Sequence, residues 1–69
     1  MTVTINGEPR DVDPDTTVAD LVSELGADRR RHGVAVAVNG EVIRRADWDQ
    51  CTVDDGDAVE VLAAIQGGT

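Results

Sequence analysis

Two Asn-Gly pairs, Asn6-Gly7 and Asn39-Gly40, constrain the fold of this chain more than any other feature. A type I′ turn needs positive φ at both central positions, which asparagine and glycine tolerate, so each pair predicts a β-hairpin. Around the first turn, residues 2–6 alternate apolar and polar side chains, and residues 8–12 return as a second strand. Pro9 predicts that the second strand lies at a sheet edge, because proline cannot donate a ladder hydrogen bond.

The remaining strands follow from their apolar patterns. Residues 34–38 alternate valine with alanine, so both faces are apolar and this segment is predicted to be an interior strand. Residues 41–43 form the return of its hairpin. After a loop over residues 44–55, residues 58–64 are predicted to form a final, apolar strand.

Between the hairpins lies one helical pattern. Apolar side chains spaced three and four residues apart predict a helix of about two turns, and its stripe consists of Val18, Leu21, Val22 and Leu25. Thr17 and Asp20 have the spacing of a capping box, which marks the start of the helix. Gly26 is predicted to end it.

The order of these elements predicts the architecture. One helix between two hairpins must cross one face of the sheet, and the final apolar strand fits in the middle, parallel to the first strand. We therefore expect an α+β, β-grasp domain over residues 1–64, in which a mixed sheet of four to five strands packs on one helix.

The chain changes character after this strand. Gln66 is followed by Gly67-Gly68 and Thr69, so residues 65–69 are predicted to form a flexible tail. Glycine lets backbone come very close to another molecule, and residues 65–68 reach roughly 13 Å when extended. Such a thread could enter a slot too narrow for side chains and present a carboxylate there.

Size and charge exclude several functions. A chain of 69 residues makes one domain with a small core and no room for an enzyme cleft. Its net charge of −8, with six arginines and no lysine, disfavours nucleic acid and anionic membranes and suits basic partners. We expect a cytoplasmic protein, because the sequence has no membrane-spanning run, no signal-peptide pattern and a single cysteine.

No group of residues indicates catalysis or a metal. The acids are scattered over turns and helix ends, and one cysteine with one histidine makes half a zinc site. Cys51 is predicted to be a small apolar side chain near the core rather than a sulfur-bearing nucleophile. His32 and the neighbouring Arg29-Arg30-Arg31 are predicted to lie in a solvated loop.

Two apolar features leave alternatives open. Trp48 could anchor a partner, but a domain this small needs large side chains, so we expect it to cover one end of the core. Leu62 lies on the opposite face of the last strand from Val61. Either it forms an exposed apolar partner surface with Val42 or Ile43, or the loop around Trp48 covers it.

Several stretches occur in an order that is typical of one protein family: Ile5-Asn6-Gly7-Glu8, Thr16-Thr17-Val18-Ala19-Asp20-Leu21, Val34-Ala35-Val36-Ala37-Val38-Asn39-Gly40-Glu41-Val42-Ile43-Arg44-Arg45, Trp48, Asp55-Gly56-Asp57, Val59-Glu60-Val61 and Gln66-Gly67-Gly68. They resemble the ThiS family, the sulfur-carrier proteins of thiamine (thiazole) biosynthesis. The resemblance covers nearly the whole chain.

The resemblance implies a ubiquitin-like fold and a protein co-substrate rather than an enzyme. It implies that an E1-like adenylyltransferase uses ATP to adenylate the carboxylate of Gly68, while Gly67, Gln66 and Ile65 thread into its site. Sulfur from a cysteine desulfurase, delivered as a persulfide, would displace AMP and leave a thiocarboxylate. A thiazole synthase would then take the sulfur. The chain itself would bind no cofactor.

Thr69 lies one residue beyond the glycine pair at which members of this family end. Either a protease removes Thr69 before Gly68 reacts, or Thr69 is not part of the natural chain, or the chain is not competent as it stands. Two other functions share these features: a carrier of another pathway, such as a molybdopterin synthase small subunit or a cysteine-forming carrier, and a β-grasp interaction module that carries nothing. The short chain and Gln66 favour the thiazole pathway.

Overall fold

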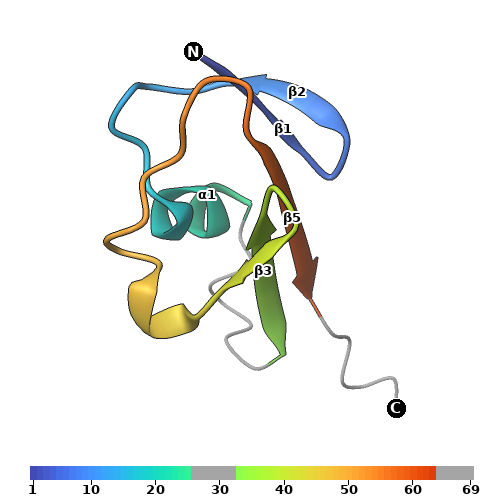
Figure 1. The fold of residues 1–69 in the computed structure, drawn as a ribbon, viewed down its shortest axis with the longest axis vertical. Helices are drawn as coiled ribbons and strands as arrows, with labels where there is room; N and C mark the ends of the chain where they lie inside the picture. The colour runs from blue at the N-terminus through green and yellow to red at the C-terminus, as the bar shows by residue number, and fades with distance from the viewer. Residues whose placement is uncertain (26–32, 64–69) are drawn as a thin grey trace.

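The computed structural model describes residues 1–25 and 33–63, which form a five-stranded sheet with a helix on one side. The elements in chain order are β1 (Thr2–Ile5), β2 (Glu8–Asp11), α1 (Val18–Glu24), β3 (Val34–Val38), β4 (Glu41–Ile43) and β5 (Ala58–Ala63). The strand order across the sheet is β2-β1-β5-β3-β4, so the last strand lies in the middle (Figure 1). The predicted mixed β-grasp sheet is confirmed, because β5 runs parallel to β1 and antiparallel to β3.

Both Asn-Gly pairs form the predicted tight turns. Asn6 and Asn39 have φ angles of 53° and 52°, and the glycines that follow them have φ angles of 87° and 84°. These turns set the registers of the β1–β2 and β3–β4 hairpins. Pro9 lies in β2, which is an exposed edge strand, as predicted.

Helix α1 begins with the predicted capping box. The backbone N–H of Asp20 donates to Oγ1 of Thr17 at 3.1 Å, and the backbone N–H of Thr17 donates to a carboxylate oxygen of Asp20 at 3.0 Å. Two backbone donors that have no partner within the helix are thereby satisfied.

The apolar stripe of α1 is one residue shorter than predicted. Three of its residues are at most 1% exposed: Val18, Leu21 and Val22. The helix ends at Glu24, and Leu25 is its C-cap residue, with 38% of its surface exposed. The stripe therefore ends where the helical backbone ends.

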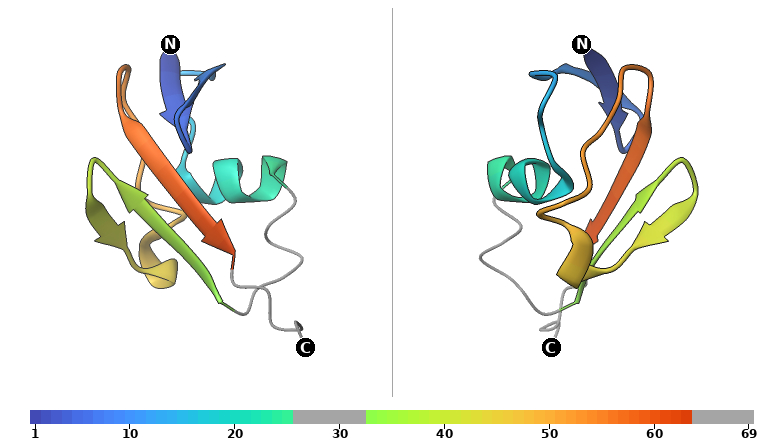
Figure 2. Two further views of the ribbon diagram at one scale, coloured as in Figure 1. Left: turned by 90° about the vertical axis from the view of Figure 1, so that its right-hand side faces the viewer. Right: turned by 60° about the vertical axis from the view of Figure 1, so that its left-hand side comes forward.

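The core lies between α1 and one face of the sheet, which we call the inner face. It is made by residues of α1, of β1, β3 and β5, and of the segment between β4 and β5: Val3, Ile5, Val18, Leu21, Val22, Val36, Trp48, Val53, Val59 and Val61. Figure 2 shows α1 on this side of the sheet. No helix or strand of the described residues covers the opposite side, which we call the outer face.

The segment between β4 and β5 closes one end of the core. It contains a short 3₁₀ helix, η2 (Arg45–Asp47), where the sequence predicts only a loop. The backbone N–H of Val18 donates to the carbonyl oxygen of Cys51 at 2.8 Å, which ties this segment to α1. Trp48 is 7% exposed, and its Nε1–H donates to the carbonyl oxygen of Ile43 at 3.0 Å. The predicted core role of Trp48 is thus confirmed.

Several predictions fall on residues that the structure does not describe. They concern the helix stop at Gly26, the solvated loop with Arg29-Arg30-Arg31 and His32, and the strand residue Ala64. Over residues 1–25 and 33–63, no helix has the length and hydropathy needed to cross a membrane.

Candidate docking face

The outer face carries an apolar surface close to the end of β5. The sheet register places Ala37 of β3 opposite Val42 of β4, and Ala35 of β3 opposite Leu62 of β5. Directly paired residues share a face, and the buried Val36 between the two alanines points to the core. The side chains that pair around Val36 therefore lie on the outer face, and we call them the outer patch: Ala35, Ala37, Val42 and Leu62.

Val42 and Leu62 supply most of the apolar surface of the outer patch. Their side chains are 71% and 65% exposed. Of the two alternatives for Leu62, the structure therefore supports exposure over coverage by the loop around Trp48. Full burial of a side chain of this kind contributes about 1.5–3 kcal/mol. Exposed apolar patches of this kind are typical of surfaces at which a partner docks.

Ile43 does not belong to the outer patch. It pairs with Val36, whose side chain is 1% exposed, so Ile43 lies on the inner face and packs against the core. Neighbours along a strand alternate between the two faces of a sheet, so Val42 and Ile43 cannot both join Leu62. The predicted partner surface is accordingly corrected to Val42 and Leu62, together with the two alanines between them.

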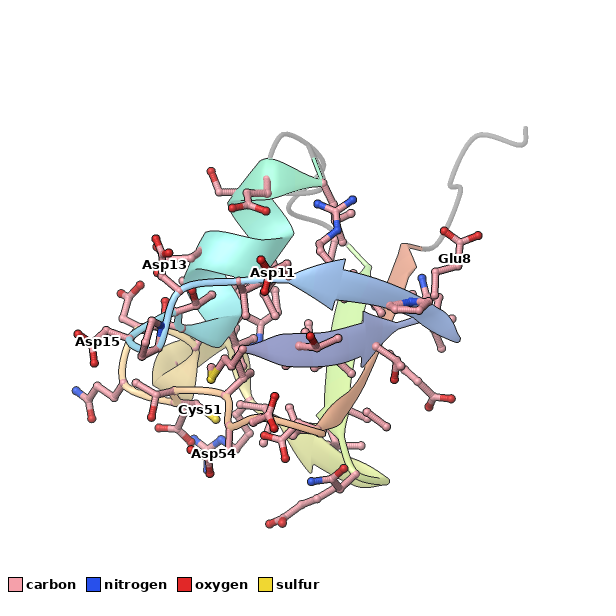
Figure 3. All side chains as sticks on the ribbon, turned by 90° about the horizontal axis from the view of Figure 1, so that it is seen from above. Glu8, Asp11, Asp13, Asp15, Cys51 and Asp54 are labelled. Carbon is pink, nitrogen blue, oxygen red and sulfur yellow. The ribbon has the colours of Figure 1, made fainter. Side chains whose placement is uncertain are left out.

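The acidic side chains are distributed unevenly around this patch. Glu60 pairs with Ala37 and therefore lies on the outer face, at the border of the patch. Exposed aspartates lie on the loops that precede α1 and β5, among them Asp13, Asp15 and Asp54, and Figure 3 shows these three on the side of the molecule away from the point where β5 ends. Leu62 lies near the end of β5, so the apolar surface is separated from these aspartates.

β5 leads from the outer patch into the predicted reactive terminus. Leu62 and Ala63 are its last two residues. The predicted site residues Ile65, Gln66, Gly67 and Gly68 lie outside the described part of the chain, so their roles stay predictions. Gly68 follows Ala63 by five residues, which span at most roughly 17 Å. A partner seated on the outer patch is therefore within reach of Gly68.

The described residues contain no candidate metal centre. Over residues 1–25 and 33–63, no three histidine, cysteine, aspartate or glutamate side chains lie close enough together to hold a metal ion. Cys51 is partly buried and packs against the core, as predicted for a small apolar side chain. Among the described residues, the structure thus places Val42 and Leu62, but not Ile43, on one face and assembles no reactive group around Cys51.

The sequence predicts Asn6 and Asn39 only as turn residues. In the structure, the side-chain amide of each also bonds to the backbone of β5, at Val61 and at Ala58 respectively. One signal was available in the sequence. Of the residues that tolerate a left-handed turn position, asparagine carries both a donor and an acceptor in its side chain, whereas glycine and ionised aspartate do not.

Comparison with known families identifies the chain. The model of the ThiS family matches residues 3–68, which include both glycines of the Gly67-Gly68 pair. This chain belongs to the ThiS family. The predicted resemblance is thereby confirmed. The five-stranded sheet and the helix α1 of the described residues agree with solved structures of ThiS.

Two ThiS proteins are similar to this chain over nearly their whole length. The sulfur carrier protein ThiS of Escherichia coli is 32% identical over 68 residues, covering 99% of this chain and 100% of that protein. The corresponding protein of Thermus thermophilus is 38% identical over 66 residues, covering 96% and 98%. A crystal structure of the thiamine biosynthesis protein ThiS from Geobacter metallireducens has a TM-score of 0.79 and 43% identity, covering 99% of this chain and 100% of that chain.

The same ThiS sequence pattern also occurs within a larger protein. A thiazole synthase of Paramagnetospirillum magneticum is 42% identical over 69 residues, which are 100% of this chain. The chain spans 21% of the length of that thiazole synthase.

Proposed function

We propose that this ThiS-family chain is a sulfur carrier of thiamine biosynthesis. Hydrolysis of the Gly68–Thr69 peptide bond frees the Gly68 carboxylate, which is then converted into a thiocarboxylate. The observation that carries the proposal is the family match, which extends through Gly67 and ends at Gly68. Two relatives of similar length are named sulfur carrier protein ThiS. The likeness to a segment of a thiazole synthase supports the thiazole pathway over a carrier of another pathway.

The proposed chemistry takes place at a single acyl carbon. A carboxylate is a poor acyl donor, because its negative charge repels nucleophiles and oxide is a poor leaving group. In an E1-like adenylyltransferase, the Gly68 carboxylate attacks the α-phosphorus of ATP, pyrophosphate leaves and an acyl adenylate forms. A persulfide from a cysteine desulfurase attacks the acyl carbon and displaces AMP. A thiol then cleaves the S–S bond and releases the thiocarboxylate, from which a thiazole synthase takes the sulfur.

The contribution of this chain is to dock and to present Gly68. Val42 and Leu62 would bury their exposed surface against an apolar area of the adenylyltransferase. Glu60 at the border of the outer patch favours a cationic side chain opposite it, in keeping with the net charge of −8. The catalytic groups and the ATP site belong to the partner, so the chain acts as a co-substrate. We also propose that the reaction takes place in the cytoplasm, where ATP is available and a single cysteine stays reduced.

The proposal is tested by the intact mass of the chain after reaction. The chain ending at Gly68 is incubated with the adenylyltransferase, ATP, cysteine desulfurase and cysteine. We expect it to gain the mass difference between sulfur and oxygen, whereas the chain ending at Thr69 stays unmodified. A chain ending at Gly68 that never gains this mass contradicts the proposal. Growth rescue of a thiazole-requiring strain that lacks its own carrier then distinguishes the thiazole pathway from other sulfur-transfer pathways.

A further inference from the structure

β5 extends further than the strand that pairs with it on one side. β1 pairs with β5 only as far as Ile5, which faces Val59, whereas β3 pairs with β5 as far as Ala63. The backbone N–H of Asn6 continues the parallel ladder by donating to the carbonyl oxygen of Val59 at 2.9 Å. Beyond this bond, the named strands of the described residues flank β5 on its β3 side alone.

The side chain of Asn6 takes the place of the missing strand. Its Nδ2–H donates to the carbonyl oxygen of Val61 at 3.1 Å, and its Oδ1 accepts from the backbone N–H of Val61 at 2.9 Å. Both bonds are partly buried. A primary amide offers the same donor and acceptor as a peptide group, so Asn6 lengthens the ladder without additional backbone.

Asn39 makes a matching contact at the opposite end of β5. Its backbone N–H donates to the carbonyl oxygen of Ala58 at 2.7 Å, and its Oδ1 accepts from the backbone N–H of Ala58 at 2.9 Å. Both asparagines occupy the first position of their turn with similar φ angles, 53° and 52°. Both side-chain amides therefore hold β5, Asn39 by one bond at its start and Asn6 by two bonds near its end. The Nδ2–H of Asn39 donates instead to a carboxylate oxygen of Asp57 at 2.9 Å.

We propose that Asn6 is a positioning residue for the reactive terminus. By holding Val61 on the side that β1 leaves open, its amide keeps β5 in the sheet up to Leu62 and Ala63. It thereby sets the point and direction from which the chain continues towards Gly68. The inference rests on the proposed function, because a fixed starting point helps only if the terminus must enter a partner. A partner that meets a strand already held in place has less backbone to order on binding.

A matched pair of variants tests the local part of this inference on the isolated chain. Asn6→Gly and Asn39→Gly each remove one side-chain amide, and glycine accepts the positive φ angle of both turns without strain. In Asn6→Gly, hydrogen exchange of the Val61 amide should accelerate by about tenfold or more, with little change at Ala58. Asn39→Gly should show the reverse pattern. In ¹⁵N relaxation, only Asn6→Gly should lower the backbone order of Leu62 and Ala63.

Steady-state kinetics with the adenylyltransferase test the functional part. With both variants in the form that ends at Gly68, Asn6→Gly should lower kcat/KM for the carrier about five- to tenfold, through a higher KM at unchanged kcat. Asn39→Gly should stay within about twofold of the wild-type value. The melting temperatures of the two variants are compared to show that both remain folded.

Several results would overturn the inference. One is an Asn6→Gly variant with the wild-type KM, and another is an equal loss in both variants, which would indicate a general effect on stability. If Asn6→Gly does not fold, Asn6→Asp replaces it, because aspartate keeps the acceptor for Val61 and loses the donor. A chain that ends at Gly68, carries no substitution and is never adenylated refutes the proposed function instead. In that case the isolated chain still tests whether Asn6 holds β5. If the hydrogen-exchange rate of the Val61 amide and the backbone order of Leu62 are the same in the Asn6 variant as in the wild type, Asn6 does not hold the strand.

Discussion

The side chain of Leu62 is 65% exposed, so replacing it with alanine should weaken docking far more than folding. Full burial of a leucine contributes about 1.5–3 kcal/mol. About a third of this surface is buried within the chain, and Leu62→Ala should therefore destabilise the fold by less than about 1 kcal/mol. The exposed two thirds remain available to a partner. Losing that contact should reduce the binding free energy by about 1–2 kcal/mol.

The two effects are measured separately. Isothermal titration calorimetry against the adenylyltransferase should show a dissociation constant about five- to thirtyfold higher for Leu62→Ala. Circular dichroism should show only a small change in melting temperature. Leu25→Ala is the matched control, because the same substitution is made at an exposed C-cap residue of α1, on the inner side of the sheet. The reasoning is refuted if Leu62→Ala binds like the wild type, or if Leu25→Ala weakens binding equally.

Four further substitutions test other parts of the structure. Leu21→Asp places a charge at a position that is 1% exposed, and the far-ultraviolet dichroism of the folded state should be lost at 25 °C. Thr17→Ala removes one half of the capping box and should lower the free energy of unfolding by about 1 kcal/mol in urea titrations. Glu60→Gln should weaken binding to the adenylyltransferase and reduce the dependence of this binding on salt; an unchanged salt dependence would argue against a cation opposite Glu60. Gly67→Val, in a chain ending at Gly68, should keep the wild-type melting temperature and fail to form the thiocarboxylate, as read by intact mass.

The amino-acid sequence by itself determined the local conformations and the order of the elements. Asn6 and Asn39 predict their turns, because few residues accept the positive φ angle that a tight hairpin requires. Thr17 and Asp20 predict the start of α1 from a spacing that is typical of a helix N-terminus. The alternation over residues 34–38 predicts an interior strand. Each of these signals depends on the backbone preferences of single residues or on side chains a few residues apart. Such local relations can be read from the sequence alone.

Only the tertiary structure decided which side chains remain available at the surface. Leu62 is exposed because no helix or strand within residues 1–25 and 33–63 covers the outer face. Val42 rather than Ile43 joins it because the register with β3 assigns their faces. Asn6 holds Val61 across a separation of 55 residues, a contact that exists only after β5 has inserted beside β1. These exposures and contacts follow from packing between segments that are far apart in the sequence. The conformational preferences of a segment do not say which distant segment will pack against it.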